Sequence, residues 1–296
     1  MPPKVSICIP TYNRKDYLKE ALESVFAQTY KDYEVVIVDD GSTDGTEEMI
    51  KNAGYDVRYY WVNHKGQSAA RNKLIELAQG RYITFLDSDD LLFPDIVERL
   101  VDIIDSYGPN VFAYGSYIGI DEKGNDVRKK RLKLPSGNIV TELFEFICVP
   151  SCGTLCAKKI YEEAGGFDTS LRRCAMYKLQ LQLSLKYDFV PVKGKGPTYK
   201  KRRHRGNPDR SFANCKIELD MLVDFYFNGG GEEIIPRHRA MKRLSKESYR
   251  VGRCALREGM YDEAYQFLSQ SLRRYPNFKS LMHWTRAIVA KRFAPS

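Results

Sequence analysis

Apolar positions in the first third of the chain follow two alternating periods. Short apolar runs bounded by Pro, Gly or Asp alternate with longer stretches in which apolar residues recur every three or four positions. The first pattern is typical of buried strands and the second of amphipathic helices. The runs predict strands at residues 5–9, 33–38, 57–62, 82–86 and 111–116. The periodic stretches predict helices at residues 16–28, 46–52, 67–79 and 94–107.

This strict alternation predicts an α/β fold with a doubly wound, mostly parallel sheet. Further on, the sequence predicts helices at 139–147, 158–164 and 174–186 and a strand at 189–192. Residues 121–138 are polar and basic, which indicates a hairpin or a loop. We expect these elements to form one domain over residues 1–215.

The remaining residues, 216–296, predict a C-terminal helical extension, with continuous helical patterning from Pro236 onward. Small and aromatic residues here are spaced as in a tetratricopeptide helix pair. They are Gly252, Gly259, Tyr261, Ala264 and Phe267, followed by Leu272 and Pro276. The last helix, 279–293, combines apolar residues with Lys291 and Arg292. It can pack on the domain or on a protomer of a homo-oligomer, or lie peripherally on an anionic membrane surface.

The composition excludes several classes of protein. No apolar run reaches 18 residues, so no transmembrane helix is predicted, and the start of the chain lacks the apolar segment of a signal peptide. The seven cysteines lack CxxC spacing, which argues against a zinc site or a disulfide framework. Cys148, Cys152 and Cys156 are more simply buried thiols than a ligand set. We expect a cytoplasmic protein, with the inner face of the membrane as the site of any peripheral contact.

Charge is unevenly distributed along the chain. Residues 1–127 carry a net charge of −9 and residues 128–296 a net charge of +18, which together give +9. A basic second half predicts either a solvated basic surface or an anionic partner such as a phosphate-bearing substrate or an anionic lipid. No nucleic-acid-binding module is present, so we do not expect a nucleic acid.

The run Asp87-Ser88-Asp89-Asp90 follows the predicted strand 82–86 and holds three carboxylates. Crowded anions are costly unless a cation neutralises them. The usual cation in such a place is a hard divalent metal ion, bound by one or two carboxylates and substrate phosphates. The alternative is an acidic turn that caps the next helix.

Three other polar loops also follow predicted strands, at residues 10–14, 39–42 and 64–72. Strand ends of a parallel sheet converge on one edge, where open α/β sheets bind ligands. Tyr12 can flank a base, Asp39 can accept from a base or ribose, and Arg71 can bridge to a carboxylate or phosphate. These loops predict a nucleotide-diphosphate site. Neither G-x-G-x-x-G nor a P-loop motif follows the first strand.

Four segments, in this order, resemble the inverting family 2 glycosyltransferases of the GT-A fold. They are Ser6-Ile7-Cys8-Ile9-Pro10-Thr11-Tyr12-Asn13-Arg14, Val38-Asp39-Asp40-Gly41-Ser42-Thr43-Asp44, Gly66-Gln67-Ser68-Ala69-Ala70-Arg71-Asn72 and Phe85-Leu86-Asp87-Ser88-Asp89-Asp90. The resemblance covers about residues 4–210. It implies a nucleotide-sugar donor and a Mg²⁺ or Mn²⁺ ion held through Asp89. It also implies these nucleotide contacts: Pro10, Thr11, Tyr12, Arg14, Asp39, Arg71, Asp87 and Ser88.

Two later segments extend the resemblance. Residues 164–168, which include Gly166, are similar to the family's Gly-Gly-Phe-Asp turn on the sugar and acceptor side. Residues 199–211 resemble a basic loop that closes over the diphosphate, and the alternative is a solvated basic loop. The residues of interest in this loop are Arg202, Arg203, His204 and Ser211, with His204 expected near the phosphate or the metal.

The chain departs from the family where the general base is expected. The family usually has a Glu-Asp or Gln-Asp pair, whose Asp is the general base, at the position of Ala175-Met176, and residues 174–186 contain no carboxylate side chain. An inverting transfer to a hydroxyl needs a base, worth roughly 10²–10⁴-fold in rate. The chain can be an inactive or altered variant, or another carboxylate such as Asp168 or Asp90 can substitute. A small shift in alignment does not supply a base. We therefore expect intact donor binding with weak or absent transfer, or an unusual base.

The resulting hypothesis is a metal-dependent inverting glycosyltransferase. The donor is a nucleotide-diphosphate sugar, with uridine expected from the resemblance, and the acceptor is a cell-surface glycan or a lipid-linked or protein-linked glycoconjugate. The alternative is an inactive protein of the same fold that binds a nucleotide-sugar or regulates a partner. Nucleotidyltransferases are a weaker alternative, because no Gly-rich, Lys-containing loop follows the first strand.

Overall fold

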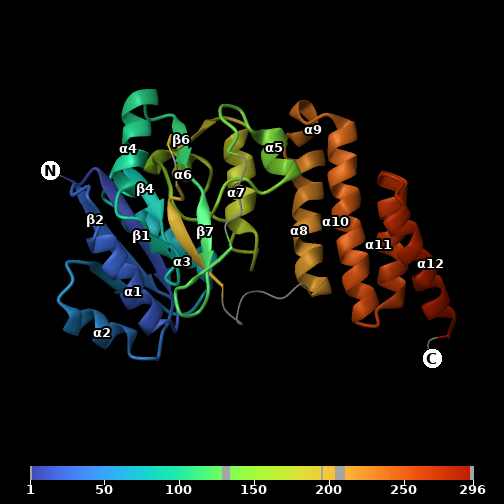
Figure 1. The fold of residues 1–296 in the computed structure, drawn as a ribbon, viewed down its shortest axis with the longest axis horizontal. Helices are drawn as coiled ribbons and strands as arrows, with labels where there is room; N and C mark the ends of the chain where they lie inside the picture. The colour runs from blue at the N-terminus through green and yellow to red at the C-terminus, as the bar shows by residue number, and fades with distance from the viewer. Residues whose placement is uncertain (1, 129–133, 195, 204–210, 294–296) are drawn as a thin grey trace. The chain divides into compact units, whose positions relative to one another are not determined.

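The computed structural model describes residues 2–128, 134–194, 196–203 and 211–293. The chain forms two compact units (Figure 1). The first consists of Met1–Ile139 and Ile147–Gly206, and the second of Val140–Phe146 and Asn207–Ser296. The boundary predicted at residue 215 stays a prediction, because contacts alone do not show which part of the chain folds independently.

The first unit is built on a seven-stranded sheet with the order β10-β6-β9-β4-β1-β2-β3. Its strands are β1 (Val5–Thr11), β2 (Tyr33–Asp39), β3 (Arg58–Trp61), β4 (Tyr82–Phe85), β6 (Val111–Tyr114), β9 (Thr154–Ala157) and β10 (Asp188–Pro191). β9 runs antiparallel to both of its neighbours, and the other pairs are parallel. The predicted mostly parallel α/β sheet is therefore confirmed.

The first unit also contains the helices α1 (Lys15–Phe26), α2 (Thr46–Ala53), α3 (Gln67–Leu77), α4 (Ile96–Tyr107), α6 (Lys158–Glu163) and α7 (Ala175–Ser184). Of these, α3, α4 and α6 contact strands of the seven-stranded sheet. All seven residues of β1 are buried, as in a strand of a sheet covered on both faces. α1 buries Leu18, Ala21, Leu22 and Val25, the apolar stripe that the sequence predicts.

A second sheet in the first unit has the order β5-β11-β7-β8. It contains β5 (Leu91–Leu92), β7 (Tyr117–Ile120), β8 (Asp126–Arg128) and β11 (Tyr199–Arg202). The sequence predicts a basic loop at the position of β11. The segment is a strand instead, because Tyr199 and Arg202 are both buried while the backbone pairs with β7 and β5.

The second unit is helical, and the predicted C-terminal helical extension is confirmed. Its helices are α5 (Val140–Glu145), α8 (Phe212–Phe227), α9 (Gly231–Ile234), α10 (Arg237–Arg257), α11 (Tyr261–Arg274) and α12 (Phe278–Phe293). A Cβ on Gly252 of α10 would lie 2.7 Å from Cγ of Leu268, so this glycine permits the close approach of α10 and α11. In the described part of the chain, no helix combines the length and the apolar character needed to cross a bilayer.

Candidate functional site

The strand-end loops meet at the edge of the sheet as predicted from their order. The parallel register of β1 with β2 places Thr11 opposite Asp39, and the Asp40 N–H donates to the Thr11 carbonyl at 2.9 Å. A cleft of about 240 Å³ lies between the loops. Its lining residues are Pro10, Thr11, Tyr12, Arg14, Asp40, His64, Gln67, Ala70, Asp87, Ser88 and Asp89.

Asp39 is fully buried. One carboxylate oxygen accepts the Ser42 N–H at 2.8 Å, and the other accepts the Tyr59 hydroxyl at 2.6 Å. Burial and the hydrogen bond to Asp39 raise the pKa of Tyr59, so its hydroxyl remains a neutral donor. Asp39 is thus a fixed acceptor at the end of β2.

Asp40 is a site residue that the list of predicted contacts omits, although it stands within the second quoted segment. Its carboxylate accepts the backbone N–H groups of Lys65 and Gly66, each at 2.8 Å, and lies 2.8 Å from Nδ1 of His64. The His64 ring stacks on Tyr12 with centroids 4.3 Å apart. Asp40 therefore holds the third loop against the second, and His64 of the third loop forms an aromatic wall of the cleft with Tyr12.

Asp87 is joined to α3 by an ion pair with Nη2 of Arg71 at 2.6 Å. Its own backbone N–H donates to Sγ of Cys152 at 3.2 Å. Burial works against ionisation here, but the charges of Arg71 and Lys201 outweigh it and hold the pKa of Asp87 below its usual value. Asp87 is therefore an ionised acceptor at the boundary of the cleft.

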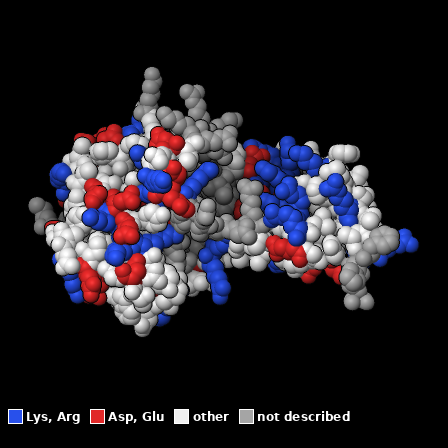
Figure 2. All heavy atoms as spheres, turned by 60° about the horizontal axis from the view of Figure 1, so that its bottom comes forward, with Lys and Arg blue, Asp and Glu red and all other residues white. Residues whose placement is uncertain are grey.

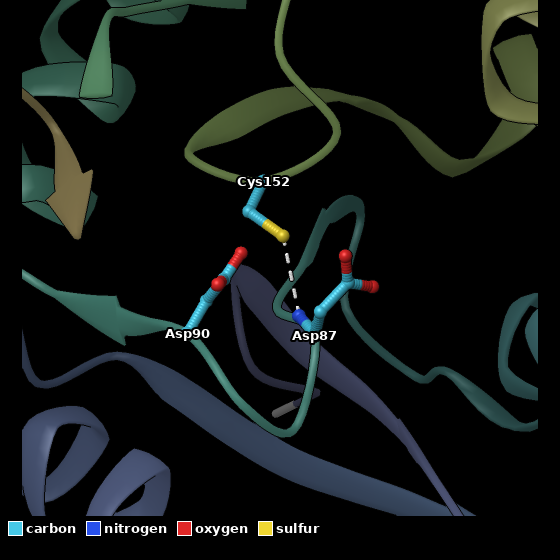
Figure 3. Close-up of side chains that lie close together, drawn as sticks. All are labelled: Asp87, Asp90 and Cys152. Atoms are coloured by element: carbon cyan, nitrogen blue, oxygen red, sulfur yellow. Dashed lines mark hydrogen bonds between the residues drawn. The ribbon is translucent and has the colours of Figure 1, made fainter. Parts of the chain in front are cut away.

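Asp90 is buried beside Asp87 and Cys152, which reaches the acidic turn from a separate loop (Figure 3). One ligand atom of each of the three residues lies within 4.8 Å of the others. Oδ1 of Asp90 accepts the Arg202 N–H at 2.9 Å, while Oδ2 has no hydrogen-bond partner among the described residues. Burial, followed by the charges of Asp87 and Asp89, raises the pKa of Asp90. The three carboxylates of the turn thus disfavour one another's ionisation, and Asp90 keeps one carboxylate oxygen without a described partner.

The donor set of the acidic turn fits a hard divalent cation. Asp87 and Asp89 both present oxygen atoms to the cleft, and oxygen is the ligand that Mg²⁺ and Mn²⁺ prefer. Asp89 forms an ion pair with Arg14, which shows its affinity for a cation. Cys152 is a poor ligand for such an ion, because burial and the nearby carboxylates raise the pKa of its thiol.

Arg202 lies under the acidic turn and does not line the cleft. Its guanidinium donates to the Asp89 carbonyl at 3.0 Å and to the Glu20 carboxylate at 2.5 Å, and it covers the Tyr17 ring. Lys201, next to it, faces the site instead. Burial lowers its pKa, but Asp90 and Asp87 have the larger combined effect and raise it.

The other residues predicted for the basic loop are separated. Arg203 has an exposed side chain, and its backbone N–H donates to the Ile120 carbonyl at 2.9 Å. Ser211 caps α8 in the second unit, where its hydroxyl accepts the Asn214 N–H at 3.2 Å. His204 lies outside the described residues. The roles expected for these residues at the diphosphate stay predictions.

A chamber of about 500 Å³ adjoins the cleft and shares Gln67 and Asp87 with it. Met176, at the position expected for the base, is among its lining residues. Of the carboxylates in the described parts of the chain, Asp87 alone lines this chamber. The absence of a general base stays a prediction.

Asp168 is already engaged elsewhere. Its carboxylate accepts Nζ of Lys178 at 2.8 Å and the Ser170 hydroxyl at 2.6 Å, and these bonds lower the pKa of Asp168 to about 2. A carboxylate with so low a pKa is a weak base at neutral pH.

Gly166 lies in a turn that is tied to α3. The Phe167 N–H donates to the side chain of Asn72 at 2.7 Å, and the Asn72 amide donates to the Phe167 carbonyl at 2.9 Å. Gly166 has φ +73, and a Cβ there would lie 2.6 Å from Oδ1 of Asn72. The turn therefore requires glycine and shapes the protein beside α3 without lining the cleft.

Comparisons with known sequences agree with this geometry. The sequence model described as "Glycosyl transferase family 2" matches residues 6–165. An uncharacterised glycosyltransferase of Rickettsia felis is 40% identical over 144 residues, which are 48% of this chain and 24% of the Rickettsia protein. The chain thus spans only about a quarter of the length of that curated relative.

Two solved structures have the same fold at low sequence identity. Residues 1–349 of S. aureus TarS in complex with UDP-GlcNAc give a TM-score of 0.62 at 17% identity, covering 98% of this chain and 91% of that one. The mannosyltransferase PcManGT from Pyrobaculum calidifontis, in complex with GDP-Man and Mn²⁺, gives a TM-score of 0.57 at 17% identity, covering 100% and 82%. The predicted GT-A fold is confirmed.

Proposed function

Because this chain belongs to glycosyl transferase family 2, we propose that it transfers a sugar from a nucleotide-diphosphate sugar to an acceptor, with inversion at the anomeric carbon. The observation that carries the proposal is the cleft at the strand ends, which combines an aromatic wall with paired carboxylates. Tyr12 and His64 offer a stacking surface for the base, and Asp87 offers an ionised acceptor for ribose. We expect a uridine nucleotide, supported by the UDP-GlcNAc complex of TarS.

A Mg²⁺ or Mn²⁺ ion is part of this proposal. Asp89, supported by Asp87, would hold it, and Arg14 would then be released from Asp89 toward the diphosphate. When bound, such an ion supplies neutralisation of the charge on the departing diphosphate. The Mn²⁺ in the complex of PcManGT supports this choice of metal.

The residues of the chain have defined tasks in the transfer. Arg71 fixes Asp87, and Asp40 fixes the loop that carries His64, so the donor enters a preformed site. The anomeric carbon would then face the chamber lined by Met176. A glycan or a lipid-linked or protein-linked glycoconjugate would enter from that chamber.

A second candidate is a protein that binds the donor without transferring the sugar. Met176 favours it, because a thioether cannot accept a proton from an attacking hydroxyl. The acidic turn argues against it, since the full set of carboxylates is retained.

The test is a thermal-shift panel of nucleotide-sugars with and without Mn²⁺, followed by assays of donor hydrolysis and transfer. A nucleotide at 100 times its Kd should stabilise the fold by about 2.7 kcal/mol. Asp89→Asn should remove the metal-dependent part of the shift. Asp188→Asn, which changes an exposed carboxylate of β10, is the matched control. Absence of any nucleotide-dependent shift would contradict the proposed donor site, and binding without transfer would favour the second candidate.

A further inference from the structure

We propose that Cys152 is a positioning residue for the donor site: its thiol holds the backbone of Asp87, so that the acidic turn presents its carboxylates to the cleft. This inference rests on the proposed sugar transfer and assigns a task to a side chain that lines neither the cleft nor the chamber. The juxtaposition that carries it is the Cys152 sulfur at the turn, brought there from 65 positions further along the chain (Figure 3).

The loop that carries Cys152 holds Asp87 at two points. The thiol is fully buried, and its Sγ accepts the Asp87 N–H at 3.2 Å. The neighbouring Ser151 hydroxyl donates to Oδ2 of the same aspartate at 3.4 Å. Together with the ion pair between Arg71 and Oδ1, these contacts hold both the backbone and the carboxylate of Asp87.

The Asp87 N–H depends on this sulfur, because the strand ladder ends just before it. The Leu86 N–H still donates to the Cys8 carbonyl of β1 at 3.0 Å, whereas the next N–H along the chain donates to Cys152. A partly buried backbone N–H that is left without an acceptor is costly. Sulfur accepts this N–H without adding a fourth carboxylate to the three of the turn. Removing the sulfur should therefore release the backbone at the start of the turn.

The position of the thiol is set by contacts outside the turn. The side chain of Gln180, buried in α7, donates to the Pro150 carbonyl at 2.8 Å and fixes the loop ahead of Cys152. Gly153 follows Cys152 with φ +64, and a Cβ there would lie 2.8 Å from Oγ1 of Thr198. The chain therefore has close contacts on both sides of Cys152, and the sulfur is a fixed point to which the turn is bound.

A fixed turn matters because Asp87 and Asp89 line the donor cleft. The Asp90 N–H donates to the Asp87 carbonyl at 3.0 Å, so a shift of the Asp87 backbone passes to the rest of the turn. Displacement of a binding group by about 1 Å can cost about a hundredfold in rate. We therefore expect loss of the sulfur to weaken the binding of both Mn²⁺ and the nucleotide-sugar, although Cys152 does not line the cleft.

Two substitutions separate the hydrogen bond from packing. Cys152→Ala and Cys152→Ser shorten the side chain by a similar amount, but serine keeps a hydroxyl that can accept the Asp87 N–H. Isothermal titration calorimetry of the full chain measures Kd for Mn²⁺ alone and for the nucleotide-sugar with the largest thermal shift. We expect Cys152→Ala to raise both Kd values by about tenfold, the effect of one hydrogen bond, and Cys152→Ser to stay within about threefold of the unmodified chain.

The matched control is Cys156→Ala. Cys156 is also fully buried, but it lies in β9, where its backbone pairs with Ile83. Among the described residues, no hydrogen bond joins its thiol to the turn. This substitution should lower the melting temperature, as Cys152→Ala does, and leave both Kd values unchanged.

The anchor of the loop provides a second test. Gln180→Leu keeps the approximate size of the side chain and removes its hydrogen bond to Pro150. Gln180 lines the chamber and not the donor cleft, so any effect on donor binding must pass through the loop. We expect both Kd values to rise by about threefold.

The outcomes distinguish this inference from the proposed function. Kd values that Cys152→Ala leaves unchanged, or that Cys152→Ser raises as much as Cys152→Ala does, would overturn the positioning role while the sugar transfer stands. If Cys152→Ala does not fold, Gln180→Leu decides: raised Kd values would support the role, and unchanged values would overturn it. An unmodified chain that binds no nucleotide-sugar would overturn the proposed function, and this inference with it.

Discussion

Gly166 shows how a single backbone position fixes the surroundings of the site. Its neighbour Gly165 has nearly the same backbone angle, φ +75 against +73, but only Gly166 approaches the side chain of Asn72. The pair therefore separates two physical effects. A left-handed backbone is strained for any residue with a Cβ, and a clash adds to that strain only at Gly166.

We predict that Gly165→Ala lowers the free energy of unfolding by about 1–2 kcal/mol through backbone strain. Gly166→Ala should cost a further 1–3 kcal/mol or so, because Asn72 must move from a site with hydrogen bonds to Phe167. Urea denaturation of both variants measures the difference. If Gly165→Ala and Gly166→Ala lower the free energy of unfolding equally, the side chain of Asn72 can move away from the added Cβ without loss of stability.

Asp168 makes a pH-dependent contribution to the free energy of unfolding, and the sign of this contribution follows from the direction of its pKa shift. Lys178 and Ser170 lower its pKa to about 2 from the usual value of 3.8. A lowered pKa means that this stabilisation is fully present above about pH 4. It is lost as the pH falls from about 4 to about 2, where the folded protein also takes up the proton.

We predict that Asp168→Asn lowers the free energy of unfolding at pH 7 by about 1 kcal/mol or less, since the pair is partly exposed. The difference from the unmodified protein should vanish near pH 2. Urea denaturation at several pH values measures this, with Asp188→Asn as control. Donor binding should be retained; if transfer is lost while binding persists, Asp168 is the missing base after all.

At the scale of elements, the sequence predicts what local periodicity encodes. β1 to β4 and helices α1 to α4 follow from apolar periods within each segment. β11 does not, because Arg202 is buried through contacts with residues far away in the chain, among them Glu20, which is 182 positions away. β9 is also absent from the prediction, and α8 lies largely within the predicted helical extension but ahead of the helical patterning that begins at Pro236. Likewise, the strand-end loops predict the donor cleft, whereas the paired roles of Asp40 and Cys152 depend on contacts between distant segments.

α12 has an apolar face that the described residues leave exposed. Its members recur at helical spacing, while Ser280 and Ala287 are buried. They are Phe278, Leu281, Met282, Ile288 and Val289. α12 also carries four Lys and Arg and no carboxylate. On the face shown in Figure 2, Lys and Arg gather over the C-terminal helices. Cations beside an exposed apolar stripe suit an anionic bilayer better than a second, equally cationic copy.

We expect the protein to bind vesicles that contain phosphatidylglycerol and not vesicles of phosphatidylcholine alone. Leu281→Asp with Val289→Asp should reduce this binding at least about tenfold, because each basic residue near the surface contributes only about 1 kcal/mol. Val127→Asp, at an exposed apolar position of β8, is the control. Cosedimentation measures binding. If the double variant instead changes the mass in light scattering, the stripe is an interface of a homo-oligomer.

At the scale of the whole molecule, the two units are interleaved along the chain. α5 lies between segments of the first unit but packs with the helices of the second. Phe144 contacts Phe225 and Tyr226 at centroid distances of 6.1 and 6.0 Å, and Glu145 accepts Nε of Arg239 at 2.6 Å. The chain therefore passes into the second unit, back into the first, and into the second again.

We predict that a chain ending at residue 206 is poorly soluble, because Leu143 and Phe144 lose the helices that bury them. Replacing both with Ser should restore solubility without changing the nucleotide-dependent thermal shift. Gel filtration of the two shortened chains measures the effect. A monodisperse first unit with Leu143 and Phe144 unchanged would contradict this prediction.

This interleaving also sets an order of events on the ribosome. Residues 140–146 are synthesised before any other part of the second unit. The apolar side chains of α5 therefore stay exposed until the helices that bury them have been made. The first unit can close its sheet only after β10 and β11 follow. During that interval α5 is an exposed apolar segment of an incompletely synthesised chain. A chaperone that binds short apolar peptides could bind it at this stage. The chain of the first unit is thus complete before α5 is covered by the other helices of the second unit.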